Sequence, residues 1–268
     1  MPLLHLVVLA VVQGITEFLP VSSSGHLVLV PVFAGWPDQG LLMDVAVHVG
    51  TLGAVMVYLS RDIWEIIAGL FNVARGRRDP KAALAGYIIL ATLPVIGAGY
   101  FLNQYYPDGI RSIIVIGWTT LGFGLFLAVT DWMGMTLRRM EHIRFVDALV
   151  IGLLQVLALI PGTSRSGITM SAARLLGFER HDAARFSMLL SIPVILGAGT
   201  LKGLELYQSG DQELTYQAFV AAGLAFVAAL IAIAVMMAWL RKSTFAPFVL
   251  YRVALGVVLL AVAYGFIT

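Results

Sequence analysis

Two polar segments that interrupt a very apolar chain carry the residue types that could do chemistry. The first, within residues 13–26, contains Gln13, Glu17, Ser22, Ser23, Ser24, Gly25 and His26. The second, within residues 155–167, contains Gln155, Gly162, Thr163, Ser164, Arg165, Ser166 and Gly167. A hydroxyl-rich turn with an acid and a histidine, paired with a hydroxyl-rich turn carrying an arginine, indicates a split site for a phosphate.

The two segments also echo each other at a shift of 142 positions, which carries Gln13 onto Gln155. The same shift places Ser22 on Ser164, Ser24 on Ser166 and Gly25 on Gly167. Where the first segment has Ser23, the second has Arg165. Identities among such common residues are weak support for a repeat by themselves, so the topology of the chain must supply independent support.

The composition indicates a membrane protein. The chain has 268 residues, of which 60% are hydrophobic and 12% charged, with a mean hydropathy of +0.92. Soluble domains have about 25% charged residues. The absence of cysteine excludes disulfides and thiolate sites. No basic run has the density that nucleic-acid binding needs. The N-terminus lacks a basic region and a cleavage site, so we expect residues 2–12 to belong to the mature protein.

About 20 apolar residues are needed to cross ~30 Å of hydrocarbon. The sequence predicts six such spans, at residues 41–59, 83–101, 113–130, 186–204, 218–240 and 247–267. Shorter apolar pieces flank each polar segment, at 3–12 and 27–33 and at 148–160 and 168–176. A short helix, a polar turn and a second short helix form the pattern of a re-entrant hairpin, which buried protein surroundings tolerate at membrane depth.

The distribution of Lys and Arg orients these spans. Residues 61–81, residues 131–147 and the pair Arg241 and Lys242 are basic, whereas residues 104–111 and 207–216 are not. The positive-inside rule therefore places the first three in the cytoplasm and both termini outside. The two hairpins then enter from opposite faces. The predicted fold is all-α and polytopic, a single membrane domain over 1–268 with an inverted repeat of about 1–130 (hairpin 3–33) and 146–268 (hairpin 148–176).

The second segment has the chemistry of an anion site. Its hydroxyls and backbone N–H groups can surround one anion, and a helix beginning near Ile168 would add its positive end. Small residues alone could equally serve close helix packing. Arg165 decides between these interpretations, because a membrane-buried arginine without an anion costs at least ~2.5 kcal/mol.

The first segment supplies reactive groups. Glu17 is an acid in apolar surroundings and is expected to face a cavity or a cation. His26 follows Ser23 by three residues, about one helical turn, so the imidazole could approach the hydroxyl as a nucleophile–base pair. His48 could line the cavity or pair with Asp44, four residues away, and we favour the pairing. Arg174 and Arg252 are expected to extend to the cytoplasmic surface.

Glu-Phe-Leu-Pro-Val-Ser-Ser-Ser-Gly-His at 17–26 and Pro-Gly-Thr-Ser-Arg-Ser-Gly at 161–167 resemble the two signature motifs of the bacterial undecaprenyl-pyrophosphate phosphatases. This is the integral-membrane family linked to bacitracin resistance, and the resemblance covers essentially the whole chain. It implies hydrolysis of undecaprenyl pyrophosphate to undecaprenyl phosphate, the carrier of cell-wall precursors, in the plasma membrane. It also implies a divalent cation, Mg²⁺ or Ca²⁺, and a homodimer as the oligomeric state of many members.

The resemblance also implies roles for single residues. Glu17, Ser23, His26 and Arg165 match the catalytic positions of the family. Glu17 and Gln13 match the metal position, although Gln13 stands where some members have Glu, which puts a site with two carboxylates in doubt. Phosphate binding falls to the remaining hydroxyls and turn glycines, namely Ser22, Ser24, Gly25, Thr163, Ser164, Ser166 and Gly167.

The sequence therefore predicts a phosphatase in which Ser23 attacks the terminal phosphorus while His26 takes its proton and Arg165 stabilises the transferred group. His26 or an activated water as the nucleophile are the alternatives. Entry of the first hairpin from outside favours the outer leaflet. A different class of function is a transporter of a lipid phosphate, which would use the same anion pocket but needs no nucleophile.

Overall fold

The computed structural model describes residues 2–37, 39–105, 112–209 and 211–266. Regular structure in these ranges is helical, apart from an isolated bridge between Arg138 and Phe178. The all-α prediction is therefore confirmed. Most of the predicted outer loop 104–111 and the last residue of the predicted span 247–267 lie outside the described residues.

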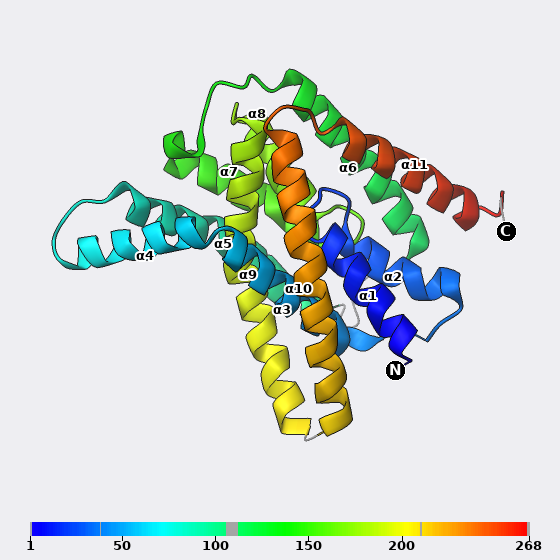
Figure 1. The fold of residues 1–268 in the computed structure, drawn as a ribbon. Coiled ribbons are helices and arrows are strands. Elements are labelled where there is room, and N and C mark those ends of the chain that lie inside the picture. The colour runs from blue at the N-terminus through cyan, green and yellow to red at the C-terminus, as the bar shows by residue number, and fades with distance from the viewer. Residues whose placement is uncertain (1, 38, 106–111, 210, 267–268) are drawn as a thin grey trace.

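The helices follow one another as Figure 1 shows. They are α1 (Leu3–Thr16), α2 (Ser23–Ala34), α3 (Gly40–Tyr58), α4 (Ser60–Ala74), α5 (Pro80–Tyr105), α6 (Ile113–Met133), η1 (Met140–His142), α7 (Phe145–Gln155), η2 (Val156–Leu159), α8 (Arg165–Leu175), α9 (Arg180–Ser209), α10 (Gln212–Leu240) and α11 (Ala246–Ala263). Four of the six predicted spans fall within one long helix each, whereas 41–59 and 247–267 run past the ends of α3 and α11.

Both polar segments form a turn between two short helices. The first turn joins α1 to α2, and the second joins α7 and η2 to α8. The predicted succession of short helix, polar turn and short helix is thus present twice. It brings the two turns to the middle of the molecule, where the surrounding long helices hold them (Figure 1).

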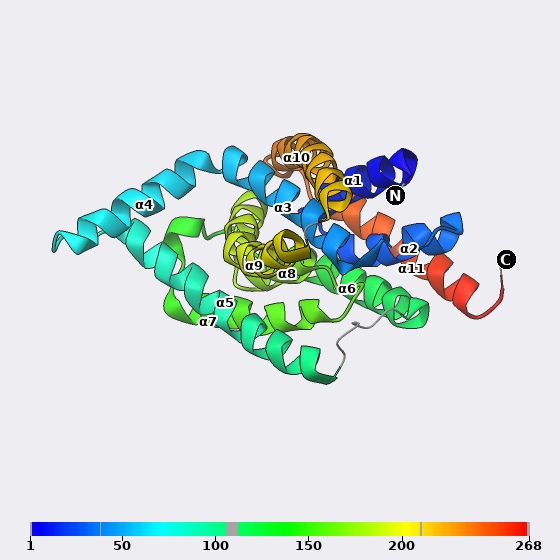
Figure 2. The same ribbon diagram turned by 90° about the horizontal axis from the view of Figure 1, so that it is seen from below.

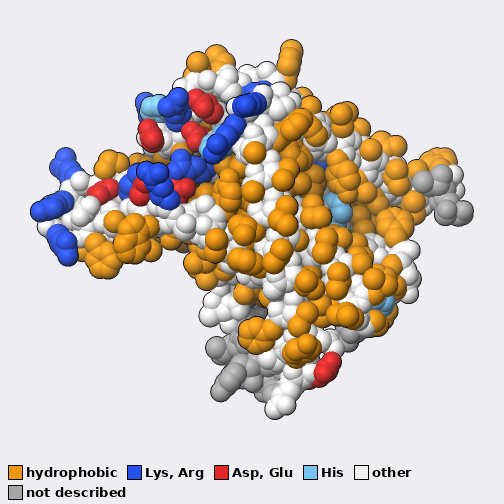
Figure 3. Space-filling view, viewed as in Figure 1, with side chains coloured by type: hydrophobic (Ala, Val, Ile, Leu, Met, Phe, Trp, Pro, Cys, Tyr) orange, Lys and Arg blue, Asp and Glu red, His pale blue; other side chains and the backbone are white. Residues whose placement is uncertain are grey.

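Length and composition make several helices capable of crossing a membrane. Among the described residues, α5, α6, α10 and α11 meet both requirements, and the bent pair α3 and α4 would make a fifth. The predicted span 186–204 lies in α9, which is helical but is not among them. The outside of the bundle is apolar over most of the face in Figure 3. Side chains such as Phe219 (74% exposed) and Val235 (65%) would face solvent unless lipid surrounded them.

Close helix contacts place the short helices against the long ones. A Cβ added at Gly14 in α1 would lie 2.5 Å from the Cβ of Ala228 in α10. A Cβ at Gly152 in α7 would lie 2.6 Å from the Cα of Ala91 in α5. Small residues at helix crossings allow such approaches in membrane proteins. Figure 2 shows α8 and α9 near the centre, with α1, α10 and α3 on one side and α5 and α7 on the other.

The predicted loop 61–81 is wrong over most of its length, because residues 60–74 form α4. This helix turns 77° away from α3 and projects from the bundle (Figure 1). Ile63 and Ile66 face the main hydrophobic core, and Arg61 pairs with Glu65 one turn later at 3.1 Å. The apolar spacing and the ion pair both favour a helix. The prediction of a loop rested on the number of basic residues in this region and did not consider that spacing.

Arg174 does not extend to the surface as predicted. Its side chain is fully buried, and its Nε donates to Asp131 at 3.0 Å while Asp131 also accepts from Arg180 at 2.7 Å. The second oxygen of Asp131 accepts from the backbone N–H of Phe245. The carboxylate of Asp131, which accepts from three donors, offsets the cost of burying the Arg174 guanidinium. Because these donors come from different helices, Asp131 also links the ends of α6, α8 and α11.

Candidate active site

The two polar turns share one backbone design. Ser22 and Ser164, which the shift of 142 positions pairs, have φ values of 75° and 72° and are the non-glycine residues with positive φ among those described. Each serine caps the following helix, since Gly25 N–H donates to Ser22 Oγ at 3.3 Å and Gly167 N–H donates to Ser164 Oγ at 3.0 Å. The sequence echo therefore corresponds to a common local structure.

The caps place two different side chains at equivalent first positions of two helices. Ser23 begins α2 and Arg165 begins α8. The N-terminus of a helix carries partial positive charge and unpaired N–H groups, so both starts favour a bound anion. The expectation that a helix begins in the second segment is confirmed, three residues earlier than Ile168.

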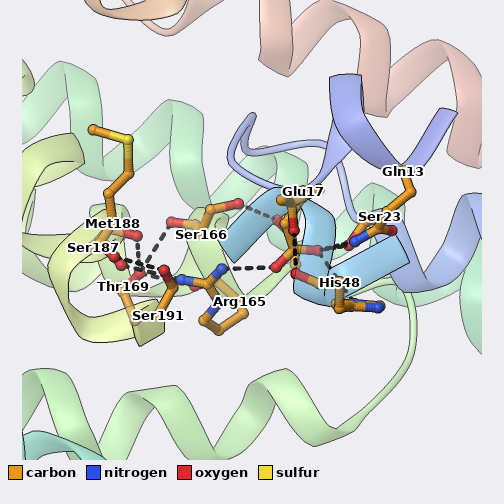
Figure 4. A network of polar contacts seen from close by, with 12 residues as sticks. Gln13, Glu17, Ser23, His48, Arg165, Ser166, Thr169, Ser187, Met188 and Ser191 are labelled. Carbon is orange, nitrogen blue, oxygen red and sulfur yellow. Dashed lines mark hydrogen bonds and ion pairs between the residues drawn. The ribbon is translucent and has the colours of Figure 1, made fainter. Parts of the chain in front are cut away.

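Glu17 and Arg165 join the two turns. Arg165 Nη2 donates to Glu17 Oε1 at 2.8 Å, and both side chains are largely buried (Figure 4). Arg165 is fixed further by a bond from Nη1 to the carbonyl of Ser187 at 3.1 Å. Ser166 adds a second link between the turns by donating to the carbonyl of Leu19 at 2.8 Å. The structure thus confirms that the two segments meet.

The second oxygen of Glu17 receives the Ser23 hydroxyl. Ser23 Oγ donates to Glu17 Oε2 at 2.6 Å, and Gln13 Nε2 donates to the same oxygen at 2.8 Å. A carboxylate that accepts a serine hydroxyl is placed to take its proton. Glu17, Ser23 and Arg165 therefore form one connected set, which the sequence had divided between two hairpins.

A cavity of about 280 Å³ opens beside this set. Its polar wall consists of Glu17, Ser23, Ser24, His48, Ser164 and Arg165. Its apolar wall includes Val45, Val95, Ala158, Leu159, Val194 and Ile195, from α3, α5, η2 and α9. One cavity with a charged end and an aliphatic end suits an amphiphile whose head is anionic.

His48 belongs to the site, contrary to the favoured pairing with the Asp44 carboxylate. Its Nδ1 donates to the backbone carbonyl of Asp44 at 2.6 Å, and its Nε2 lies 3.4 Å from Glu17 Oε2. The helical spacing of four residues brought His48 to the Asp44 carbonyl rather than to its carboxylate. A polar histidine within the apolar span 41–59 was the feature of the sequence that could have indicated this position. Of the two alternatives considered for His48, the structure shows the one in which it lines the cavity.

His26 does not approach Ser23 as expected. Its Nδ1 donates to the carbonyl of Ser22 at 2.7 Å, and its Nε2 lies 2.6 Å from the hydroxyl of Tyr251 in α11. Ser23 turns to Glu17 instead. Three residues on a helix correspond to a rotation of about 300°. Here Ser23 contacts Glu17 in the turn after α1, whereas His26 contacts Tyr251 in α11.

The predicted phosphate-binding residues separate into two groups. Ser24 and Ser164 line the cavity. The remaining residues serve the turns themselves or lie buried behind them: Ser22, Gly25, Thr163, Ser166 and Gly167. Their hydroxyls and amides shape the two turns, which hold the cavity-lining residues in place.

Arg252 is also buried rather than extended to the surface, with no exposed area. It donates to backbone carbonyls of both turns and of α6. The remaining histidines lie away from the cavity: His5 stacks on Trp36, His142 accepts from the N–H of Arg139, and His181 lies beside Asp182.

Two residues of the first segment carry oxygen atoms of the kind that bind a divalent cation. Glu17 is the carboxylate, and the amide oxygen of Gln13 is buried without a hydrogen-bond partner. Within the described ranges no cluster of three or more His, Asp or Glu side chains forms a protein cage for a metal. Mg²⁺ commonly binds through one or two carboxylates together with phosphate oxygens of the substrate, so the residues fit a cation that arrives with a phosphate.

Comparison with known proteins gives a consistent result over nearly the whole chain. The family described as bacitracin resistance protein BacA matches residues 6–258. The chain is 53% identical over 271 residues to undecaprenyl-diphosphatase 1 of Rhodospirillum rubrum, which covers 98% of this chain and 96% of that protein. It is 51% identical over 267 residues to the undecaprenyl-diphosphatase of Ruegeria pomeroyi, an alignment that covers 99% of this chain and 100% of that protein. The undecaprenyl-diphosphatase of Chromohalobacter salexigens is 49% identical over 259 residues, which cover 96% of this chain and 97% of that protein.

Proposed function

Because the chain belongs to the bacitracin resistance protein BacA family, we propose that it is a membrane phosphatase that hydrolyses undecaprenyl pyrophosphate to undecaprenyl phosphate and phosphate. The observation that carries the proposal is the set Ser23, Glu17 and Arg165 at the polar end of an otherwise aliphatic cavity. The family and the apolar helices make the chain a multi-pass membrane protein.

The cavity accounts for the substrate class. An isoprenoid diphosphate has a highly charged head and a hydrocarbon tail. The head matches Arg165 and the two helix starts, and the first part of the tail matches the aliphatic walls from α3, α5 and α9. Arginine suits phosphate oxygens because its planar fork donates two parallel hydrogen bonds.

The first chemical step follows from the contacts of Ser23. Its hydroxyl already donates to Glu17, so Glu17 takes the proton as Ser23 Oγ attacks the terminal phosphorus. The new Oγ–P bond forms while the bond from that phosphorus to the bridging oxygen breaks, and undecaprenyl phosphate leaves with the bridging oxygen. Glu17 then passes its proton to the departing phosphate. This assignment replaces His26 by Glu17 as the base, because His26 takes other partners.

The second step returns the enzyme to its starting state. Water attacks the phosphoserine, Glu17 takes a proton from that water, and the Ser23 oxygen recovers a proton as the Oγ–P bond breaks. Arg165 stabilises the charge that develops on the phosphoryl oxygens, and its bond to Glu17 is exchanged for the substrate. His26 holds the first turn through Ser22, and His48 orients Glu17.

A divalent cation, Mg²⁺ or Ca²⁺, completes the proposal. Glu17 would hold it, with the unpartnered amide oxygen of Gln13 as a second ligand. When bound, such an ion neutralises phosphate charge. Arg165 and the helix starts provide the protein's own share of this neutralisation.

The membrane organisation that we propose has six spans and two re-entrant hairpins in an inverted repeat, within a single domain over 1–268. The shared turn geometry at Ser22 and Ser164 supports the repeat. The basic residues 61–81 and 131–147 support a cytoplasmic side, which leaves both termini outside. The first hairpin then opens the site toward the outer leaflet of the plasma membrane, and a homodimer is the proposed assembly.

Phosphate release by purified protein in detergent tests the function. Undecaprenyl pyrophosphate and shorter isoprenoid diphosphates are compared, with and without a chelator, and Ser23→Ala serves as the inactive control. Release that the control lacks supports hydrolysis. A protein that binds the lipid but releases no phosphate would support the transport alternative, since detergent leaves no second compartment. At present no observation favours transport over hydrolysis.

A further inference from the structure

Arg252 in α11 is a fully buried cation held by backbone carbonyls. Its Nη2 donates to Gly162 O at 2.9 Å and to Thr119 O at 3.4 Å. Its Nε donates to Thr120 O at 3.2 Å and its Nη1 to Pro20 O at 3.3 Å. Among the described residues no carboxylate forms an ion pair with it, which distinguishes it from Arg165 and Arg174.

Two of these carbonyls occupy equivalent positions in the repeat. The shift of 142 positions that pairs Ser22 with Ser164 also pairs Pro20 with Gly162. Each carbonyl stands two residues before the serine with positive φ in its turn. One guanidinium therefore binds the same point of both turns from a third helix.

The remaining contacts strengthen this arrangement from α6. Thr119 Oγ1 donates to Pro161 O at 2.6 Å, next to the carbonyl of Gly162 that Arg252 binds. A Cβ at Gly167 would lie 2.8 Å from Arg252 Nη1, so α8 approaches the guanidinium closely. The second turn is thus enclosed by α6, α11 and the start of α8.

The cost of this arrangement requires an explanation. A buried charge without a carboxylate is unfavourable, and an apolar side chain of similar volume would pack α11 without that cost. A non-glycine residue at positive φ is strained as well, and it persists only where its surroundings over-determine the backbone. Both strained turns meet the buried guanidinium just before they present Ser23 and Arg165.

We propose that Arg252 is a positioning residue, which fixes the separation of the two turns so that Ser23 and Arg165 face the same phosphoryl group. Arg252 does not line the cavity and is not catalytic itself. The inference rests on the proposed phosphatase function. It predicts that loss of Arg252 weakens the chemical step more than it weakens substrate binding.

The test compares Arg252→Ala with the wild type in detergent, on monodisperse protein. A misplacement of reacting groups by 1 Å costs about 100-fold in rate. We expect kcat to fall by about that factor with KM little changed, because the lost alignment acts in the transition state. Methylguanidinium, which fits the space vacated by the side chain, should restore part of the lost kcat. Arg252→Lys should be intermediate, since one ammonium cannot serve both turns as a guanidinium does.

Arg174→Ala is the matched control. Arg174 is another fully buried arginine, but it pairs with Asp131 away from both turns. The control should lower the thermal midpoint while the folded protein keeps its kcat, and methylguanidinium should leave that kcat unchanged. A merely structural Arg252 would behave like this control.

Two results would overturn the inference. One is a folded Arg252→Ala protein with wild-type kcat, and the other is a tenfold or greater rise in KM with kcat retained, which would make Arg252 a substrate ligand. If Arg252→Ala does not fold, the same criteria apply to Arg252→Lys. Failure of the wild type to release phosphate would instead refute the proposed function, so the two failures are distinguishable.

Discussion

The guanidinium of Arg165 and the carboxylate of Glu17, 148 positions apart in the chain, form an ion pair of 2.8 Å that closes the gap between the two polar turns. Without substrate, Glu17 is the anion that neutralises Arg165. In the proposed mechanism a pyrophosphate replaces Glu17 at Arg165, while the other oxygen of Glu17 keeps its contact with Ser23. Under that proposal, the pair links binding of the anionic head to the carboxylate that acts on Ser23.

Arg165→Ala should abolish phosphate release and also destabilise the protein. Glu17 would remain buried without its main cation, and breaking a buried pair costs on the order of 3 kcal/mol. The double variant Arg165→Ala with Glu17→Gln should recover stability but not activity. Thermal unfolding and phosphate release, measured on the same preparations, check both parts. Wild-type turnover in Arg165→Ala would refute the site.

Ser23→Ala should remove phosphate release, because it removes the group that donates to Glu17 and attacks phosphorus. Rapid acid quench of the wild type with substrate labelled at the terminal phosphate should recover the label on Ser23. Ser24→Ala, which changes a neighbouring serine of the cavity wall, should keep the covalent label. Label on His26, or no covalent label, would instead support the histidine or an activated water as nucleophile.

His26→Asn should retain more activity than His26→Ala. The asparagine amide can still donate to the carbonyl of Ser22, which is the contact that the imidazole Nδ1 makes. If His26 were the base, the two variants would be equally inactive, since neither side chain accepts a proton near neutral pH. The ratio of the kcat values of the two variants therefore shows whether His26 holds the first turn through Ser22 or transfers a proton in the reaction.

His48→Gln should reduce kcat less than His48→Ala. Glutamine can donate to Glu17 Oε2 from roughly the position of the imidazole Nε2, whereas alanine leaves that side of the carboxylate without a contact. Asp44, whose backbone carbonyl holds the imidazole, is left unchanged in both variants. Equal kcat values for wild type and His48→Ala would exclude His48 from the site.

Gly14→Ala should lower the thermal midpoint, because the added Cβ would lie 2.5 Å from the Cβ of Ala228 and force α1 away from α10. Overpacking of this kind costs about 1–3 kcal/mol. Gly86→Ala in α5 is the control, since its Cβ would meet no atom within 4 Å and alanine favours helix. Similar midpoints for the two variants would show that the α1–α10 contact adjusts freely.

The helical class, the positions of the two turns and the pairing of an acid-and-serine segment with an arginine segment could all be predicted from the amino-acid sequence. These properties are local: apolar length predicts helices, and short polar runs with serine and glycine predict turns. The equivalence of Ser22 and Ser164 appeared in the sequence as a repeat and in the structure as a shared positive φ.

Which side chains contact one another could not be predicted without the three-dimensional fold. Helical spacing predicted that His26 lies near Ser23, but its Nε2 contacts Tyr251 in α11 instead. His48 does contact Asp44, through the backbone carbonyl, and its other ring nitrogen lies near Glu17 just after α1. The charge of Arg174 and Arg252 predicted that both side chains extend to the surface. In the structure both are buried, because Asp131 binds Arg174 and the turn carbonyls bind Arg252. The physical reason is that the partner of a buried polar group is chosen by proximity in space, which periodicity and composition along one chain do not encode.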